Sequence, residues 1–318
     1  MNKKKIALMD RFHPTKFTEG DNFIGYAKGF LEKNCEIFQL DPYKIDFANK
    51  KTKAYSLILT KGRKFSKSNS TKEIYLENFD AIMDLSDIVD LNFAQQLSKI
   101  KTIHINDPIA TYKSADKRTY VKRYPELIPE SLVSSNINEL ERNLMDKFNG
   151  QMILKNPFGC CGNDIEKITQ KTQNRKEIFL TMTQNGTLPI VAQEFVELAY
   201  EGSKRIAILG NPKNPESYKI IHFYKRQPKQ GEWKDNLSQG GKVVEIPSLR
   251  KDEIKLCLEV AKKSGLYTMG LDIMDNINKE GKRIPQLIET NSVLALAFGR
   301  YPEKLKIVTN FITGELLE

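Results

Sequence analysis

Two strand-like segments near the C-terminus place oxygen-bearing side chains where packing alone favours apolar residues. The segments, YTMGLDIMD (267–275) and RIPQLIETN (283–291), are separated by the turn-forming stretch NINKEGK. Antiparallel pairing predicts that Asp272 lies opposite Glu289 and Asn291, and the last two share one strand face. Three hard oxygen donors without histidine or cysteine suit Mg²⁺, which nucleotide phosphates and water normally complete. A solvated polar face of a sheet is the alternative.

A glycine-bearing turn forms a second candidate site. The stretch ILKNPFGCCGND (153–164) predicts a strand, a turn and another strand. Gly159 and Gly162 allow backbone amides to approach phosphate oxygens, and Lys155 on the strand can neutralise their charge. The Gly-Lys-Ser/Thr of a Walker loop is missing. Taken alone, these residues are better explained by an ordinary hairpin turn.

The segment QEFVE (193–197) ends a β-rich run. Gln193 and Glu194 stand there beside the apolar Phe195 and Val196. A strand that exits into a linker can offer backbone groups and a carboxylate to a purine edge. A plain strand end is the alternative.

Three cationic side chains lie between these segments in the sequence. Arg205 alternates with apolar residues in KRIAIL (204–209), so it points to one face of a predicted strand. Arg226 and Lys234 fall in YKRQPKQGEWKDNLSQGGK (224–242), whose composition predicts a long polar loop. Arginine binds phosphate or carboxylate with paired hydrogen bonds. Surface ion pairs are the alternative for each.

The order of predicted elements indicates an α/β protein. KKKIALMD, FIGYAKGFLEKN and CEIFQLD predict a strand, a helix and a strand, so the chain begins with a parallel α/β domain that ends at about Pro108. A helix carrying Lys117 follows. RKDEIKLCLEVAKKSGL (250–266) predicts an amphipathic helix with Ile254, Leu258 and Ala261 along one stripe. KGRKFSKSNSTKE (61–73) is the most loop-like stretch.

Composition narrows the class of protein further. The chain has 318 residues, 40% of them hydrophobic, which is enough for real cores. A net charge of +10 favours an anionic ligand without identifying it. The four cysteines lack Cys-x-x-Cys spacing, so a structural zinc site is not expected. The short apolar run after the first lysines does not fit a signal peptide or membrane span, and we expect a cytoplasmic protein.

Taken in order, these segments resemble the ATP-grasp superfamily, in its glutathione synthetase and RimK-like carboxylate-amine ligase branch. The resemblance rests on ADKRTYVKRYPELIP, ILKNPFGCCGND, QEFVE, KRIAIL, RQPKQGEWKDNLSQGGK, GLDIMD and IETN, and it covers nearly the whole chain. It implies an α/β (α+β) ATP-grasp fold with an N-terminal Rossmann-like (pre-ATP-grasp) domain. The implied domains are 1–108 and 109–318, the latter with a lid subdomain at about 125–195 and a catalytic subdomain at about 196–318.

The resemblance also implies roles for individual residues. It implies nucleotide contacts from a helix lysine, a strand lysine, a flexible lid loop and a linker, namely Lys117, Lys155, Phe158, Gly159, Gly162, Gln193, Glu194, Phe195 and Val196. It implies that the Mg²⁺ ligands are Asp272, Glu289 and Asn291. Arg226 corresponds to an arginine that steadies an acyl-phosphate, and Arg205 and Asn236 fall at active-site positions. ATP with one or two Mg²⁺ or Mn²⁺ ions is therefore expected.

The chain departs from glutathione synthetases on the substrate side. They place a basic residue soon after the strand that matches FDAIMD, where this chain has MDLSDIVD with Asp84, Asp87 and Asp90. Acidic groups there favour an amino or other cationic group over a carboxylate. The apolar run SVLALAFG follows Asn291, and the paired Cys160 and Cys161 in the lid loop are unusual.

The resemblance implies that ATP phosphorylates a carboxylate and that an amine then displaces phosphate to form an amide. The substrates would be small molecules, amino acids or peptides, and the protein a homo-dimer or homo-tetramer, with no nucleic-acid or membrane partner. An ATP-grasp kinase of the inositol phosphate type is the alternative, but its DxNxFPGY ending is not matched by ETNSVLALAFGRYP. A noncatalytic nucleotide or nucleic-acid binder would not need the Asp272, Glu289 and Asn291 trio.

Overall fold

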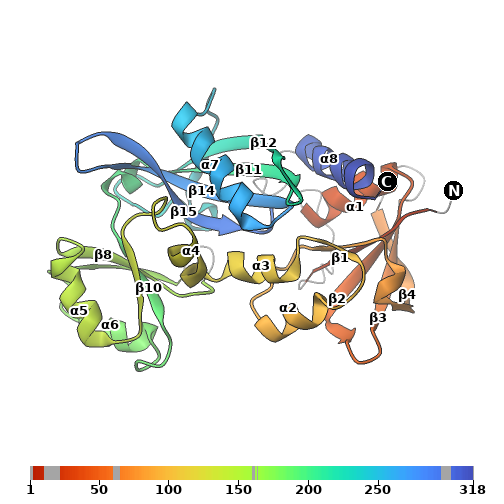
Figure 1. The fold of residues 1–318 in the computed structure, drawn as a ribbon, viewed down its shortest axis with the longest axis horizontal. Helices are drawn as coiled ribbons and strands as arrows, with labels where there is room; N and C mark the ends of the chain where they lie inside the picture. The colour runs from red at the N-terminus through yellow and green to blue at the C-terminus, as the bar shows by residue number, and fades with distance from the viewer. Residues whose placement is uncertain are drawn as a thin grey trace.

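Three β-sheets organise the chain in the computed structural model (Figure 1). The structure describes residues 3–10, 22–59, 65–159, 162, 164–294 and 302–317. A six-stranded sheet is built from the N-terminal residues, a four-stranded sheet from the middle of the chain and a five-stranded sheet from the residues after 202. The predicted elements therefore fall into an α/β unit followed by two antiparallel sheets.

The N-terminal sheet has a parallel half and an antiparallel half, in the order β4-β3-β2-β1-β5-β6. Its parallel strands are β1 (Lys5–Met9), β2 (Glu36–Asp46), β5 (Ala81–Asp84) and β6 (Ile103–Ile105). Strands β3 (Lys51–Leu59) and β4 (Phe65–Tyr75) extend it in antiparallel fashion. The predicted strand, helix and strand at the N-terminus are confirmed, because apolar runs such as Ile6–Met9 are fully buried.

Strand β4 corrects the prediction that residues 61–73 form a loop. Most of this stretch pairs with β3, as in Lys53 opposite Glu73 and Tyr55 opposite Thr71. Its Lys, Ser and Thr residues are typical of an edge strand, because polar and charged side chains there hinder pairing with strands of other molecules. The composition of residues 61–73 indicated a loop, but hydrogen-bond pairing with β3 makes most of this stretch a strand.

Helices α1 (Asn22–Glu32) and α2 (Leu91–Leu97) belong to the N-terminal unit, and α3 (Pro108–Ala115) and α4 (Lys117–Arg123) lead out of it. The break predicted at Pro108 is the first turn of α3, where proline fits because no amide partner is needed there. Asp116 ends α3 and caps α4, since its side chain accepts a hydrogen bond from the Arg118 amide. Lys117 is consequently the first residue of α4, which ends at Arg123, before Pro125.

The four-stranded sheet is antiparallel, in the order β7-β10-β8-β9. Its strands are β7 (Ser131–Ser134), β8 (Gln151–Lys155), β9 (Ile165–Thr169) and β10 (Ile190–Glu194). Helices α5 (Ile137–Asp146) and α6 (Arg175–Met182) pack on it through a core that includes Leu140, Phe148 and Phe179. The predicted β8–β9 hairpin is confirmed, with Lys155 paired to Ile165.

The five-stranded sheet is also antiparallel, in the order β13-β12-β11-β14-β15. Its strands are β11 (Ser203–Asn211), β12 (Asn214–Gln227), β13 (Lys242–Val244), β14 (Thr268–Ile277) and β15 (Arg283–Asn291). Helix α7 (Lys251–Ser264) packs on it, but the predicted stripe was wrong in part. Cys257, Val260 and Ala261 form the buried face, while Ile254 is exposed.

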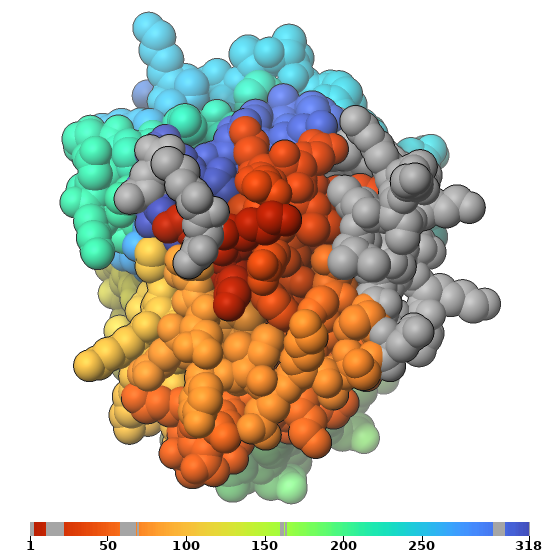
Figure 2. Space-filling view, turned by 90° about the vertical axis from the view of Figure 1, so that its right-hand side faces the viewer, coloured from red at the N-terminus to blue at the C-terminus, as the bar shows by residue number. Residues whose placement is uncertain are grey.

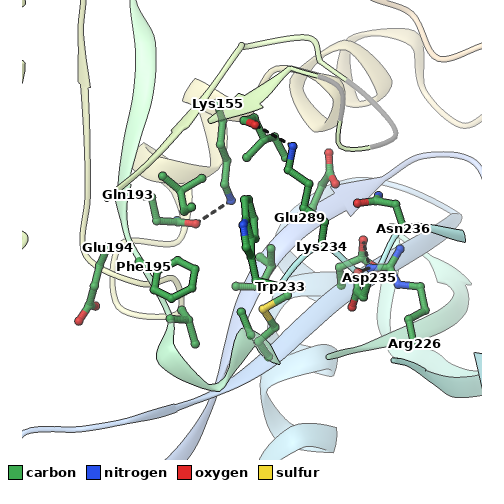
Figure 3. Close-up of a pocket in the computed structure, with 17 residues that line it drawn as sticks. Lys155, Gln193, Glu194, Phe195, Arg226, Trp233, Lys234, Asp235, Asn236 and Glu289 are labelled. Carbon is green, nitrogen blue, oxygen red and sulfur yellow. Dashed lines mark hydrogen bonds and ion pairs between the residues drawn. The ribbon is translucent and has the colours of Figure 1, made fainter. Parts of the chain in front are cut away.

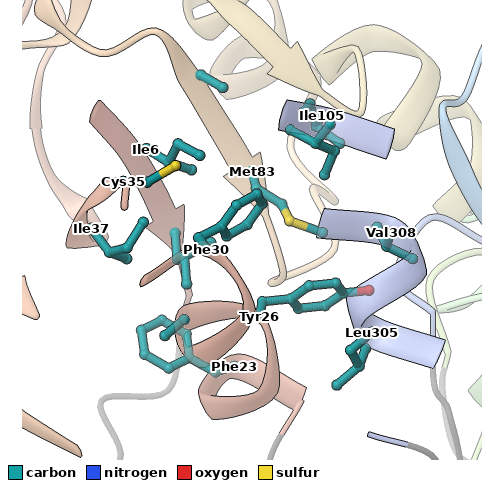
Figure 4. Close-up of a cluster of buried hydrophobic side chains, with 14 of the residues drawn as sticks. Ile6, Phe23, Tyr26, Phe30, Cys35, Ile37, Met83, Ile105, Leu305 and Val308 are labelled. Carbon is teal, nitrogen blue, oxygen red and sulfur yellow. The ribbon is translucent and has the colours of Figure 1, made fainter. Parts of the chain in front are cut away.

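The C-terminal helix α8 (Pro302–Phe311) lies against α1 (Figure 1), in a core cluster that also includes Ala207 and Leu209 of the five-stranded sheet. Leu305 and Val308 pack with Phe23 and Tyr26 of α1, as Figure 4 shows. The π-helical turn η4 (Ile312–Leu316) continues it. On the face shown in Figure 2, C-terminal residues in blue border N-terminal residues in red and orange.

Three 3₁₀ turns complete the fold: η1 (Leu76–Asn78), η2 (Glu197–Glu201) and η3 (Leu237–Gln239). Across the described ranges, no helix combines the length and apolarity that a membrane crossing requires. The domain boundaries at 108, 125 and 195 stay predictions.

Candidate active site

The candidate site is a pocket between the four-stranded and five-stranded sheets (Figure 3). Strand β8 contributes Lys155, and β10 with the linker after it contributes Gln193 and Phe195. The facing sheet contributes Arg226 from β12 and Glu289 from β15. Residues as distant in sequence as Lys155 and Glu289 therefore line the two walls.

Of the two predicted lysines, Lys155 lines this pocket and Lys117 contacts Glu289, which also lines it. Lys155 is buried, and its Nζ donates a hydrogen bond of 2.6 Å to Gln193 Oε1. Lys117 Nζ lies 2.9 Å from Glu289 Oε1. The pKa of Lys155 is lowered to about 8, mainly by burial; the charge of Glu289 opposes this lowering and the charge of Lys117 adds to it. The site is thus short of negative charge around Lys155.

The start of α4 fixes the position of Lys117. Its backbone amide donates to Pro157 O at 2.9 Å, and its Nζ also donates to Gly159 O. Both carbonyls belong to the turn between β8 and β9, so α4 and this turn are tied together by one residue. This contact was not predicted from the sequence, because Lys117 and Gly159 lie far apart in it.

The linker after β10 has one polar end and one apolar end. The side chain of Gln193 is buried, and its amide is satisfied by two hydrogen bonds: Nε2 donates to Ser131 Oγ at 2.8 Å and Oε1 accepts from Lys155. Phe195 and Val196 line the apolar part of the pocket. The carboxylate of Glu194 is directed away from Lys155 in Figure 3, and burial raises its pKa.

Arg205 and Asp272 form a buried ion pair on adjacent strands of the five-stranded sheet. Arg205 Nε lies 2.5 Å from Asp272 Oδ1, and Arg205 Nη2 lies 3.0 Å from Oδ2. Arg226 Nη2 approaches the same Oδ2 at 3.0 Å. Burial alone raises the pKa of Asp272, but the two guanidinium groups outweigh it and the net pKa is below the usual range. Asp272 is therefore ionised.

Two further groups hold Arg226 in place. Ser203 Oγ accepts hydrogen bonds from Arg226 Nε at 3.1 Å and from Nη2 at 2.8 Å. Asp235 Oδ1 lies 3.6 Å from Nη2, and Asp235 Oδ2 accepts from the Ser203 amide at 2.7 Å. The two arginines and the two aspartates balance in formal charge. The polar-loop prediction was wrong for Arg226, which is buried in strand β12.

The three proposed metal ligands lie at neighbouring positions of one hairpin. Asp272 pairs directly with Glu289, and Asn291 pairs with Gly270 two residues further along the ladder. Thr290 and Ser292, on either side of Asn291, are fixed from outside the sheet. Thr290 Oγ1 donates to Ser114 O at 3.2 Å, and Ser292 O accepts from Asn106 Nδ2 at 2.8 Å.

The donor chemistry of this trio fits a hard cation. Asn291 Nδ2 is buried and has no hydrogen-bond partner in the described part of the chain. A half-turn of that amide exchanges its nitrogen for an oxygen, so the position can supply a ligand. Glu289 is partly exposed and ionic, whereas Asp272 would have to share its oxygens with two arginines. Among described residues, no three His, Cys, Asp or Glu side chains form a metal-binding group.

The predicted lid residues divide between two surroundings. Phe158 packs away from the pocket against Tyr112, at 5.7 Å between ring centroids. Gly162 has a φ of +74°, which favours glycine, and its carbonyl accepts from Lys234 Nζ at 3.0 Å. A Cβ on Gly162 would overlap Asn236 Oδ1, so these two predicted residues are in contact. Cys160 and Cys161 lie outside the described residues.

Sequence reasoning missed Trp233 and Asp235. Trp233 lines the pocket, and its ring meets that of Phe195 edge to face at 5.9 Å. It is the one tryptophan of the chain, set in a polar loop, and an isolated large aromatic among polar residues was the available signal. Asp235 gave no signal, because a charged loop residue is ordinarily solvated.

The pocket lies between two antiparallel sheets and combines cationic side chains with an apolar slot. This arrangement is that of a nucleotide-binding protein of the ATP-grasp type. The family model described as "Prokaryotic glutathione synthetase, ATP-grasp domain" matches residues 117–281, just over half of the chain. The chain belongs to that family. The expected superfamily and branch are thereby confirmed.

Known relatives are distant. The glutathione synthetase of Synechococcus elongatus is 28% identical over 177 residues, which are 55% of this chain and 51% of that protein. The chain thus matches about half the length of this curated relative.

Solved structures confirm the fold class. A RimK domain ATP-grasp protein from Sphaerobacter thermophilus superimposes with a TM-score of 0.66 at 14% identity, covering 98% of this chain and all of that one. A RiPP-associated ATP-grasp ligase from Chryseobacterium gregarium, solved with ADP and a leader and core peptide, gives 0.60 at 14% identity and 96% coverage of both chains. At such identities the likeness establishes the fold.

Proposed function

We propose that the protein is an ATP- and Mg²⁺-dependent carboxylate-amine ligase that forms an amide bond through an acyl-phosphate, acting on an amino acid or a peptide. The observation that carries this proposal is the convergence of Lys117, Lys155, Arg226 and Glu289 beside an apolar slot. A nucleotide suits such a pocket, since its base takes the slot and its phosphates meet the cations. Family membership supports the same chemistry.

The reaction would proceed in two steps. A carboxylate oxygen of the acid attacks the γ-phosphorus of ATP and ADP departs; the amine nitrogen then attacks the acyl carbon, phosphate departs and the nitrogen loses a proton. Lys117 and Lys155 would neutralise the phosphates, and Arg226 would hold the transferred phosphoryl group. Arg205 fixes Asp272, and Asn236, in the loop after β12, contacts Gly162 of the glycine turn, whose closure would exclude water.

Glu289 and Asn291, with Asp272, would hold one or two Mg²⁺ or Mn²⁺ ions. When bound, the cation would supply additional charge neutralisation for the phosphates of ATP. The ionic partner of Glu289 is Lys117, so the same carboxylate links the phosphate-binding lysine to the metal end of the pocket. This dual contact supports a role for Glu289 in the chemistry.

Acidic residues on the substrate side support an amine as the second substrate. Asp84, at the end of β5, is buried and accepts a hydrogen bond of 2.6 Å from Ser86 Oγ. Asp87 Oδ1 accepts from Ser292 Oγ at 2.7 Å, and Ser292 directly follows Asn291. Asp87 therefore lies next to the proposed metal end, and with Asp84 three residues before it would favour an amino group as acceptor. We include peptides among the proposed substrates because the RiPP-associated ATP-grasp ligase, whose fold is similar, was solved with a leader and core peptide.

The test incubates the protein with Mg²⁺, ATP, mixed amino acids and small peptides. Phosphate release and the masses of new products are followed. ADP formation together with a product that has lost one water supports ligation, whereas a phosphorylated product supports the kinase alternative. If carboxylate-rich acceptors react best, the role given to Asp84 and Asp87 is wrong.

Light scattering after size exclusion would check the proposed homo-dimer or homo-tetramer. The cytoplasmic location stays a prediction.

A further inference from the structure

The apolar slot of the pocket contains the side chain of Trp233. This residue lies in the loop between β12 and β13, and Figure 3 shows its indole in the middle of the pocket. Its ring meets Phe195 at 5.9 Å with an interplanar angle of 87°. The indole also packs with Ile153 and Met274, from the two opposing sheets. Trp233 therefore fills the space between the walls.

The size of the remaining cavity supports this description. About 80 Å³ is open in the pocket. Sites for cofactor-sized ligands typically measure about 300–1,000 Å³. A purine and its ribose consequently do not fit beside the indole, although the surrounding residues have the chemistry for them. The side chain that can leave without breaking a sheet is the loop residue Trp233.

Residues on the C-terminal side of Trp233 fasten this loop across the pocket. Lys234 Nζ donates to Gly162 O and to Ile165 O, both at 3.0 Å, and so binds the loop to the β8–β9 hairpin. Asp235 Oδ2 accepts from the Ser203 amide at 2.7 Å. Lys234 thus uses its charge on carbonyl oxygens, which are weaker partners than the phosphates that the pocket is suited to bind. Nucleotide phosphates can compete for Lys234.

We propose that Trp233 is a plug that closes the nucleotide pocket in the free protein and that ATP or ADP must displace it. The inference rests on the proposed function, because the displacing ligand is the nucleotide of that reaction. A protein whose competent state is a minor population binds its ligand with an affinity reduced by that population. An open fraction of about 10% or less, usual for a minor conformer, slows association roughly tenfold or more.

The sole tryptophan gives a direct readout of this motion. In the wild-type protein, ADP should change the tryptophan emission and increase its quenching by acrylamide, as the indole leaves Phe195 for solvent. The association rate of mant-ADP, followed by direct excitation of the mant group, should saturate with concentration because opening precedes binding. In Trp233→Ala the rate should rise linearly and exceed the wild-type rate by about tenfold or more.

Two further variants control for loss of folding and for loss of an aromatic ring. Trp233→Phe keeps an aromatic side chain of smaller size and should give intermediate rates, so the test survives if Trp233→Ala does not fold. Tyr43→Ala removes an exposed ring on β2 and should behave as wild type.

Slower or weaker mant-ADP binding by both Trp233 variants, with unsaturated wild-type rates, would overturn the plug and make Trp233 a fixed wall. ADP binding detected by calorimetry without any change in tryptophan emission overturns the plug alone. An absence of heat with both ADP and ATP overturns the proposed function as well. The two failures are therefore distinguishable.

Discussion

Lys155 sits at a buried position whose electrostatics change once an anion arrives. Desolvation lowers its pKa to about 8, well below the ordinary value for lysine, and Gln193 offers it only a neutral oxygen. The unfolded chain therefore binds more protons than the folded one between about pH 8 and 10.5, so stability from this group grows as the pH rises through that range. Phosphate would reverse the shift, since an opposite charge favours the protonated amine.

Nucleotide binding should consequently take up a proton at pH 8.5. Most of the free protein carries a neutral Lys155 at that pH, and the complex carries a charged one. Calorimetry of ADP binding in buffers of different ionisation enthalpy measures the uptake, which should approach one proton at pH 8.5 and vanish near pH 6.5. Lys155→Met should abolish the uptake. An equal uptake in that variant would assign it to another group.

Glu289 is the residue on which the proposed metal end depends most. Glu289→Gln keeps the shape of the side chain and removes its charge, so we expect turnover to fall by about a hundredfold or more while the fold is kept. Phosphate release measures turnover, circular dichroism reports the fold, and Mn²⁺ paramagnetic resonance in the presence of ADP measures metal binding. Glu280→Gln, on the exposed turn of the same hairpin, is the matched control. Unchanged turnover in Glu289→Gln would remove this residue from the site.

At the scale of elements, the β8–β9 hairpin and the loop after β12 depend on each other. Lys117 and Lys234 donate to carbonyls on the hairpin turn from opposite sides, and Asn236 contacts Gly162. Because the hairpin turn and this loop contact each other beside the pocket, a displacement of one is expected to move the other. The proposed lid function would thus depend on two elements and not on the glycine turn alone.

A pair of glycines separates backbone strain from this contact. Gly162 and Gly281 have φ values of +74° and +75°, but a Cβ on Gly162 would overlap Asn236 whereas one on Gly281 meets nothing within 4 Å. Both alanine variants should lose roughly 1 kcal/mol of unfolding free energy in urea titrations. Only Gly162→Ala should in addition change the KM for ATP. Equal kinetics in the two variants would show that the hairpin and the loop are not coupled.

Across the whole molecule, the C-terminal helix α8 connects the end of the chain to its beginning. Leu305 and Val308 are fully buried against Phe23, Tyr26 and Gly25 of α1. The residues after the five-stranded sheet therefore stabilise the N-terminal sheet, and folding of the two is linked.

Leu305→Ala should lower the unfolding free energy by about 2–5 kcal/mol, because it removes buried methyl groups and leaves a cavity. Ile307→Ala, on the exposed side of the same helix, should cost no more than about 1 kcal/mol. Urea denaturation followed by circular dichroism measures both. A small effect of Leu305→Ala would mean that α8 can detach from α1 without loss of the core.

Local patterns in the sequence determined most of the elements and pointed to the proposed metal end of the site. Periodicity identified the strands and the main helices, and the turn-forming stretch between β14 and β15 predicted their hairpin. The pairing of Asp272 with Glu289 also requires a β-bulge between Asp272 and Ile273, which the sequence did not indicate. Lys117 and Lys155 were identified through the family resemblance. These features depend on residues close in sequence or on motifs in a fixed order.

Tertiary structure alone decided the rest. Strand β4 exists because β3 offers it hydrogen bonds, Arg226 is buried because Ser203, Asp235 and Asp272 surround it, and α8 rests on α1 across almost the whole chain. Trp233 occupies the apolar slot because two sheets leave an apolar gap beside its loop. Each outcome depends on partners distant in sequence, whose contact energies do not appear in local propensity or periodicity.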